Sequence, residues 1–192
     1  MLPEPRRRIA DELLARSRAH DAEQADRLDR YRNLEPETAE LLHLLVVAAG
    51  PARVLELGTS NGYSTLWLAD ACEQAGARLV SVDVDAARQA EAAVVLAEAG
   101  LTVELRCADA ADVLREAGPW DVVFLDAERP AYAGYWPDLL RVVPPGGLLA
   151  IDNVLSHADE VGEVTALIEA EPSVLTSLVP IGAGLRLVVR RR

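Results

Sequence analysis

The stretch VLELGTSNGYSTLWLA, residues 54–69, decides how we interpret the rest of the sequence. An apolar strand runs straight into a glycine-containing turn, and a helical pattern follows at once. In an open parallel sheet the ligand crevice lies beyond the carboxyl ends of the strands, and the first strand-to-helix turn forms its floor. Gly58 and Gly62 allow positive φ and a close approach of the backbone to a ligand. The stretch therefore predicts a strand, a turn and a helix that together hold a small ligand.

The glycine turn lacks the fingerprint of a dinucleotide site. That fingerprint is GxGxxG, whereas this turn reads GxxxG, with Ser60 where the second glycine would stand. A pyrophosphate is therefore disfavoured. Glu56, a carboxylate at the end of the strand, would repel a phosphate but could accept a hydrogen bond from an ammonium group or a buried amide. A zwitterionic ligand suits the turn, and a purely structural glycine turn stays open as the alternative.

Downstream of this turn, short runs rich in Val, Leu and Ile alternate with segments of helical periodicity. The alternation is typical of parallel strands joined by crossover helices, and continuously apolar strands imply that both faces of the sheet are covered. We therefore predict an α/β fold. Strands are expected at residues 53–57, 79–83, 102–106, 121–125, 148–151, 173–179 and 185–190, and helices are expected to begin near Gly62, Ala86, Ala110, Tyr132 and Asp159.

Two further helices are expected before the first strand, at residues 5–33 and 35–50. They form an N-terminal helical annex over residues 1–50. The first is highly charged, with Leu13, Leu14, Leu28 and Tyr31 among its few apolar residues, so it could lie over the site or against a partner subunit. A solvated cap is an equally good interpretation. We expect residues 1–192 to form a single domain.

Composition limits the partners that this chain can have. Its 192 residues include 19 basic and 31 acidic side chains, and the net charge of −12 disfavours nucleic acid and an anionic membrane surface. No apolar run approaches the roughly 20 residues of a membrane span, and the N-terminus turns acidic where a signal peptide would be apolar. Cys72 and Cys107 form no CxxC motif and have no nearby His, which argues against a disulfide framework or a zinc site. We expect a cytoplasmic protein.

Acidic residues also follow the second and third strands. Asp83, in SVDVD (81–85), stands where an acidic residue binds ribose hydroxyls, whereas its neighbour Asp85 is expected to cap the next helix. Asp109 and Ala110 stand at the following carboxyl end. Asp109 could meet an adenine amino group or cap the helix that it precedes, and the sequence favours neither role.

Four motifs, taken together, resemble a known family. VLELGTSNGYSTLWLA, SVDVD, FLDAERPAYAGYW (124–136) and GGLLAIDNV (146–154), in this order and spacing, are similar to the class I O-methyltransferases that use S-adenosylmethionine. The likeness is closest to the cation-dependent branch, with the catechol and caffeoyl-CoA O-methyltransferases and their bacterial relatives, and runs from about residue 35 to residue 190.

The resemblance implies a Rossmann-like fold with a mostly parallel, seven-stranded sheet, an antiparallel last strand and helices on both faces. It also implies a homodimer and a pocket for S-adenosylmethionine, with these lining residues: Glu56, Gly58, Ser64, Asp83, Asp109 and Ala110.

A metal site is expected where the fourth and fifth strands end. Asp126 follows one strand, and Asp152 and Asn153 follow the other. Neighbouring strands lie about 4.8 Å apart, so these side chains can converge on one cation. Three oxygen ligands suit Mg²⁺ first, with Mn²⁺ or Ca²⁺ as alternatives, better than Zn²⁺. Two adjacent hydroxyls of a phenolic, catechol-like substrate could complete the coordination, as the resemblance implies.

Asp126 and Arg129 are the candidate catalytic residues. Arg129 stands where the family commonly has a lysine that assists deprotonation. Because arginine is effectively always protonated, it could stabilise an oxyanion but is a poor general base. His157 could be that base or a solvent-exposed loop residue. Tyr132, Tyr135 and Trp136 could wall a planar substrate or belong to the core.

The sequence thus favours a metal-dependent O-methyltransferase of a small phenolic molecule. Two alternatives come from other classes. One is a protein that binds S-adenosylmethionine but has lost turnover or its metal dependence, suggested by Arg129. The other is a nucleotide-dependent oxidoreductase on a similar sheet, which the absence of GxGxxG argues against.

Overall fold

Seven strands pair into one sheet in this computed structural model, which describes residues 1–27, 29–116 and 118–192. Their order is β3-β2-β1-β4-β5-β7-β6. The strands from β3 to β5 run parallel, and β7 pairs antiparallel with both β5 and β6. The predicted sheet is confirmed. Its strands are β1 (Arg53–Leu57), β2 (Arg78–Asp83), β3 (Glu104–Cys107), β4 (Val122–Leu125), β5 (Leu148–Ile151), β6 (Val174–Val179) and β7 (Leu185–Arg190).

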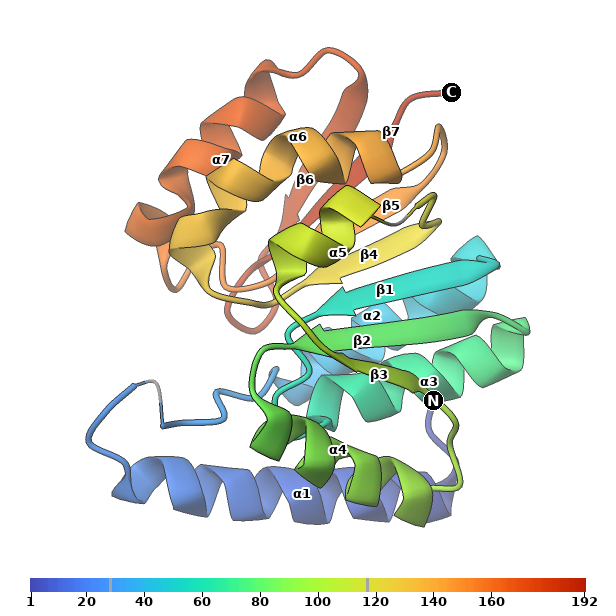
Figure 1. The fold of residues 1–192 in the computed structure, drawn as a ribbon, viewed down its shortest axis with the longest axis vertical. Helices are drawn as coiled ribbons and strands as arrows, with labels where there is room; N and C mark the ends of the chain where they lie inside the picture. Colours follow the sequence, from blue (N-terminus) through green and yellow to red (C-terminus); the bar gives the residue numbers. More distant parts are fainter. Residues whose placement is uncertain (28, 117) are drawn as a thin grey trace.

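Helices cover both faces of this sheet (Figure 1). The covering follows from the strands, because successive apolar side chains point to opposite faces: Val54 joins the core on one side, and Leu55 joins the core on the other. On the first side lie α1 (Glu4–Glu23), α2 (Pro36–Ala49), α3 (Tyr63–Ala75) and α4 (Ala86–Glu98), and on the second lie α5 (Ala110–Glu116), α6 (Tyr132–Val142) and α7 (Ala158–Ala170), with a 3-10 turn, η1 (Arg129–Ala131), leading into α6.

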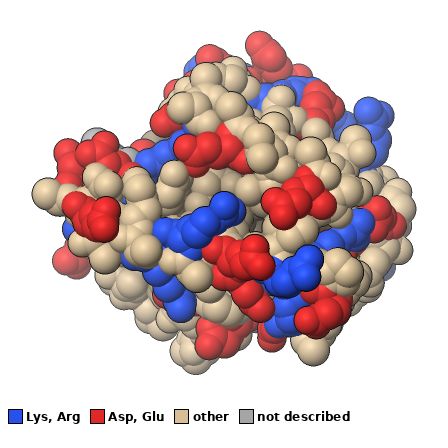
Figure 2. Space-filling view, turned by 90° about the horizontal axis from the view of Figure 1, so that it is seen from below, with Lys and Arg blue, Asp and Glu red and all other residues tan. Residues whose placement is uncertain are grey.

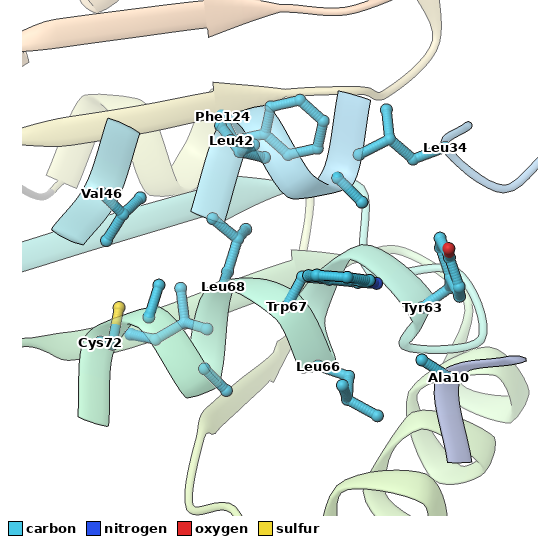
Figure 3. Close-up of a cluster of buried hydrophobic side chains, with 14 of the residues drawn as sticks. Ala10, Leu34, Leu42, Val46, Tyr63, Leu66, Trp67, Leu68, Cys72 and Phe124 are labelled. Carbon is cyan, nitrogen blue, oxygen red and sulfur yellow. The ribbon is translucent and has the colours of Figure 1, made fainter. Parts of the chain in front are cut away.

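The N-terminal annex shares its core with the sheet. Figure 3 shows Leu42 of α2 beside Phe124 of β4, while Trp67 of α3 lies in the same cluster as Ala10 of α1. Cys72 is buried there, and burial raises the pKa of its thiol to about 12. Because annex and sheet bury one continuous set of side chains, we propose that they form a single domain.

The helix expected over residues 5–33 is shorter than predicted, because α1 ends at Glu23. The Asp21 carboxylate accepts hydrogen bonds from the backbone N–H groups of Tyr31 (2.8 Å) and Arg32 (2.9 Å), and the Arg30 side chain donates to the carbonyl of Gln24. The Arg30 contact satisfies a carbonyl group at the helix end, and the Asp21 contacts hold residues 31 and 32 beside the last turn of α1. Leu28, which we expected on this helix, lies outside the described residues.

Charged side chains of both signs are interspersed on the side of the molecule seen from below in Figure 1, where α1 lies (Figure 2). No continuous basic face is visible there, consistent with the net charge of −12. The helices formed by the described residues include none that is long and apolar enough to cross a membrane.

A buried ionic cluster ties the annex to α3. The Asp70 carboxylate is fully buried and accepts hydrogen bonds from Arg6 Nη1 of α1 (2.7 Å) and from Gln74 Nε2 (2.6 Å). His43 Nε2 of α2 lies 2.8 Å from the same carboxylate. Burial opposes ionisation of Asp70, but the hydrogen bonds from Arg6 and its other partners outweigh it and lower the pKa.

We expect Asp70→Asn to lower the free energy of unfolding by about 3 kcal/mol at pH 7, because Arg6 would keep its charge in a largely buried position without a full counter-charge. Urea denaturation measures this change. Glu73→Gln is the matched control: Glu73 also pairs with Arg6, but its side chain is 57% exposed, so a loss below about 1 kcal/mol is expected. Equal losses in the two variants would contradict the role given to Asp70.

Candidate active site

A cavity of about 400 Å³ lies at the carboxyl ends of the parallel strands. All of the predicted site residues line it except Glu56 and Asp152, which are buried behind its wall. Its position agrees with the rule for open α/β sheets. The lining comprises Tyr31, Arg32, Asn33, Leu34, Gly58, Thr59, Ser60, Tyr63, Ser64, Val82, Asp83, Val84, Asp85, Arg88, Ala108, Asp109, Ala110, Asp126, Ala127, Glu128, Arg129, Tyr135 and Asn153.

The glycine turn is pressed against the loop that follows β4. Gly58 has φ +108°, and a Cβ atom there would lie 2.0 Å from the carbonyl oxygen of Asp126. The backbone N–H groups of Gly58 and Thr59 donate to the carbonyl of Val82, at 2.8 Å and 3.2 Å. Only glycine permits both this φ and this contact. The turn therefore sets the distance between the part of the cavity beside β1 and β2 and Asp126.

Glu56 belongs to a buried hydrogen-bond network. Its carboxylate accepts from the hydroxyls of Ser64 (2.6 Å) and Thr65 (2.5 Å) of α3 and from that of Ser81 (2.6 Å) of β2. Burial raises its pKa to about 7, against the lowering effect of the three hydroxyls. Of these residues Ser64 also lines the cavity. Glu56 thus orients a hydroxyl group of a residue that lines the cavity.

The folded protein holds the Glu56 proton more tightly than the unfolded chain does, so stability should fall as pH rises from 4.5, the ordinary pKa, to about 7. We expect the titration of Glu56 alone to lower the free energy of unfolding by about 3 kcal/mol between these two pH values. Glu56→Gln, which stays neutral, should remove it. The measurement is the free energy of unfolding of both proteins at intervals between pH 4.5 and pH 8. Other carboxylates titrate in both proteins, so parallel curves for the two would contradict the prediction.

The acidic residues after β2 and β3 hold the backbone as well as lining the cavity. Asp83 accepts hydrogen bonds from the N–H groups of Ser60 (2.8 Å) and Asp85 (3.0 Å). Asp85 caps α4, as predicted, by accepting from the N–H groups of residues 87 and 88. Asp109 accepts from the N–H of Ala111 (2.7 Å) at the start of α5. Asp83 and Asp109 therefore stand in fixed positions on the cavity wall.

Asp126, Asp152 and Asn153 converge at the ends of β4 and β5. Asn153 Nδ2 lies 2.9 Å from Asp126 Oδ1 and 3.0 Å from Asp152 Oδ2, and so bridges the two carboxylates. Asp152 Oδ1 is buried without a hydrogen-bond partner among the described residues. Asn153 has φ +66°, a conformation that asparagine tolerates better than most residues. The predicted convergence of these side chains is present.

The electrostatics of this trio favour a positive charge beside it. Burial raises the pKa of Asp152, and the nearby charge of Asp126 raises it further. Burial also raises the pKa of Asp126, while Arg32 and Arg129 lower it. No three His, Cys, Asp or Glu side chains in the described part of the chain are placed to hold a metal ion. A cation here would therefore depend on the amide oxygen of Asn153 as well as on the carboxylates.

Arg129 is not a surface residue: its side chain is only 3% exposed. Its Nε donates to Glu160 of α7 at 2.8 Å, and Glu160 also binds Arg27 at 3.1 Å and 3.2 Å. Its Nη2 is buried without a hydrogen-bond partner among the described residues. Arg129 is thus fixed by an ion pair on one side and lines the cavity.

The sequence interpretation missed the wall made by residues 31–34. Asp21 holds this segment through two backbone N–H groups, the Ser60 hydroxyl donates to the carbonyl of Tyr31 (3.2 Å), and Arg32 pairs with Glu128 at 2.9 Å. Pro36, the first residue of α2, was the available signal, because a proline there favours an extended chain before the helix. The connection after α1, rather than the charged helix itself, lies beside the site.

Of the other candidate side chains, one lines the cavity and the rest do not. Tyr135 lines the cavity, whereas Tyr132 and Trp136 are buried in the core, with the Tyr132 hydroxyl donating to the carbonyl of Ala127. His157 does not line the cavity, and its ring accepts or donates one hydrogen bond with Ser156. Burial, followed by the charge of Arg129, lowers the pKa of His157. We therefore assign it no role in the site.

Comparison with known proteins identifies the family. A sequence profile described as O-methyltransferase matches residues 11–191. The chain belongs to this O-methyltransferase family. A catechol O-methyltransferase from Niastella koreensis is 36% identical to it over 149 residues, which make up 74% of this chain and 65% of that enzyme. The match thus spans about two thirds of the relative's length.

Two solved structures of O-methyltransferases share the whole fold. One, from Bacillus cereus in complex with S-adenosylhomocysteine, is 25% identical, has a TM-score of 0.81, and covers 100% of this chain and 93% of its own. The other is an O-methyltransferase from Streptomyces achromogenes that is involved in tomaymycin synthesis, in complex with S-adenosylmethionine. It is 25% identical, has a TM-score of 0.79, and the match covers 100% of this chain and 92% of the other chain. The resemblance to S-adenosylmethionine-dependent O-methyltransferases is therefore confirmed.

Proposed function

We propose that this protein transfers a methyl group from S-adenosylmethionine to a hydroxyl of a small catechol-like molecule, with a divalent cation at Asp126, Asp152 and Asn153. The observation that carries the proposal is the convergence of these three side chains beside the cavity, with Asp152 Oδ1 buried and without a partner. The similar catechol O-methyltransferase supports the class of substrate.

The residues present fit a hard cation. Two buried carboxylates close to one another are costly to keep ionised unless a positive charge compensates them. Asp152 Oδ1 has no hydrogen-bond partner among the described residues and could coordinate a cation. The side-chain amide of Asn153, whose Nδ2 bridges the two carboxylates, also carries an oxygen that could coordinate it. Mg²⁺ suits such a donor set, and Mn²⁺ or Ca²⁺ would also fit.

The cofactor would lie between the glycine turn and the ends of β2 and β3. Asp83, which lines the cavity, would bind the ribose hydroxyls, and Asp109 with Ala110 would meet the adenine. Ser64, oriented by Glu56, and the backbone at Gly58 face the same cavity and suit the amino-acid end of the cofactor. This leaves the side of the cavity formed by Asp126, Arg129 and Tyr135 for the substrate.

Methyl transfer from a sulfonium to an oxygen is an in-line displacement, so alignment and deprotonation of the hydroxyl are the main tasks. A divalent cation lowers the pKa of a coordinated hydroxyl. Arg129 cannot accept the proton, because its guanidinium stays charged, but it can stabilise the resulting oxyanion. The close contact of Gly58 with Asp126 would fix the spacing between the methyl donor and the acceptor hydroxyl.

We expect Asp152→Asn to abolish Mg²⁺-dependent binding of catechol and to lower kcat by at least about 100-fold, because a charged oxygen ligand is lost. Calorimetry of catechol binding in the presence of S-adenosylhomocysteine, with and without Mg²⁺, gives the binding result. Affinity for S-adenosylhomocysteine itself should change less than about threefold, since Asp152 follows β5, whereas the groups assigned to the cofactor follow β1, β2 and β3. The exposed Asp112→Asn is the control for the same substitution.

Unchanged catechol binding in Asp152→Asn would leave the family assignment standing and remove the cation from the proposal. Firm binding of S-adenosylhomocysteine without methyl transfer to any catechol, with or without Mg²⁺, would instead favour the alternative of a binding protein without turnover.

We also propose a homodimer, which would bury apolar side chains on α2. Leu44 is 56% exposed and Val47 is 38% exposed, one helical turn apart. Light scattering should give about twice the chain mass of 20.7 kDa, and Leu44→Glu should shift the protein toward the monomer. A wild-type mass equal to that of one chain would exclude the homodimer. The cytoplasmic location stays a prediction from the sequence.

A further inference from the structure

Two arginines on the substrate side of the cavity have donor groups that no described residue satisfies. Arg32, from the connection between α1 and α2, and Arg129, from η1, both line the cavity. Arg32 Nε and Arg129 Nη2 are buried and have no hydrogen-bond partner among the described residues. Both side chains lie near Asp126, whose charge they stabilise.

The two guanidinium groups are held in place from behind. Arg129 Nε donates to Glu160 at 2.8 Å, and Arg32 Nη2 donates to Glu128 at 2.9 Å. Arg27 binds Glu160 at 3.1 Å and lies 3.5 Å from Glu128, which links the two ion pairs. Each arginine thus has one edge fixed by a carboxylate, which limits the orientations of the rest of its planar fork.

Unpaired donors of this kind require an acceptor. A buried donor without a partner costs about 1–3 kcal/mol, and more when the group is charged. Arg129 cannot relieve the cost by losing its proton, since a guanidinium stays charged in proteins. An anionic oxygen is the best partner for it, because hydrogen bonds between charged groups are roughly twice as strong as neutral ones.

We propose that Arg129, assisted by Arg32, binds an anionic group of the substrate, so that the preferred substrate is a catechol carrying a carboxylate. This inference rests on the proposed function and deepens it by naming the substrate class. Arg129 follows Asp126 by three residues on the loop after β4, whereas the groups assigned to the cofactor come from β1, β2 and β3. The planar fork of arginine matches a carboxylate in two-point binding, which a neutral catechol cannot offer.

The test compares 3,4-dihydroxybenzoate with 3,4-dihydroxybenzamide, which differ in charge but little in shape. Both are titrated by calorimetry into the full-length protein saturated with S-adenosylhomocysteine and Mg²⁺. We expect the acid to bind at least about tenfold more tightly than the amide. In Arg129→Gln this preference should fall below about threefold through loss of affinity for the acid alone. Binding is the readout because Arg129 also stabilises the oxyanion in turnover.

Controls separate this inference from its alternatives. Arg106→Gln, on an exposed arginine of β3 paired with Glu104, should keep the wild-type preference. If Arg129→Gln fails to fold by thermal melting, Arg32→Gln carries the same comparison, with a smaller loss of preference expected. A fall in S-adenosylhomocysteine affinity in these variants, with the preference kept, would place the guanidinium on the cofactor carboxylate and overturn the inference.

The remaining outcomes are also decisive. Equal affinity of the wild-type protein for acid and amide would overturn the inference and leave the proposed function intact. Failure of the acid, the amide and catechol itself to bind, even with Mg²⁺ present, would overturn both proposals together.

Discussion

The contact between the backbone of Gly58 and the carbonyl of Asp126 is the constraint on which the site depends. No side chain fits between them, because a Cβ on residue 58 would lie 2.0 Å from that oxygen. The contact joins the turn after β1 to the loop after β4, and β4 pairs in register with β5. The turn after β1, where we propose that the cofactor binds, and the residues after β4 and β5, where we propose a cation, therefore lie along one edge of the sheet. A displacement at the turn would be transmitted to Asp126 directly, which suits a reaction that requires in-line alignment.

The buried charged side chains near this edge of the sheet are stabilised by different kinds of partner. Glu56 relies on three hydroxyls, Arg129 has Glu160, and the carboxylates of Asp126 and Asp152 have only an amide bridge between them. The hydroxyls satisfy the Glu56 carboxylate, but Glu160 leaves Arg129 Nη2 unpaired and the amide bridge leaves Asp152 Oδ1 unpaired among the described residues. Because a half-satisfied buried network is unfavourable, the unmatched charges are the positions where we propose that ligands bind. Arg129 lies on the wall of the cavity, which residues 126–129 and 153 help to form, and Asp152 immediately precedes Asn153 of that wall.

The strands were predictable because their signal is local. The apolar runs in the sequence predict the first and last residues of β1 and β5. Leu57, Leu125 and Ile151 lie side by side in neighbouring strands, so the residues that follow β4 and β5 lie at the same edge of the sheet. The path of residues 29–34 was not predictable. It depends on pairs remote in sequence, such as Arg32 with Glu128, 96 residues apart. The role of Glu56 was hidden similarly, because its hydroxyl partners lie on two other elements and carry no pattern of their own.

The absence of lysine gives the site a distinct electrostatic character. All 19 basic residues of the chain are arginines, so no lysine can serve as a base anywhere in the sequence. A lysine buried as deeply as Arg129 would have its pKa lowered by burial and could exchange a proton with the substrate. An arginine keeps its charge at every pH at which the protein is folded. Proton uptake and release must then fall to the carboxylates and to the substrate hydroxyl, while Arg129 and Arg32 supply a constant positive field. In the proposed mechanism such a site would select its ligand by charge, and deprotonation would depend on a cation held by the oxygens of Asp126, Asp152 and Asn153.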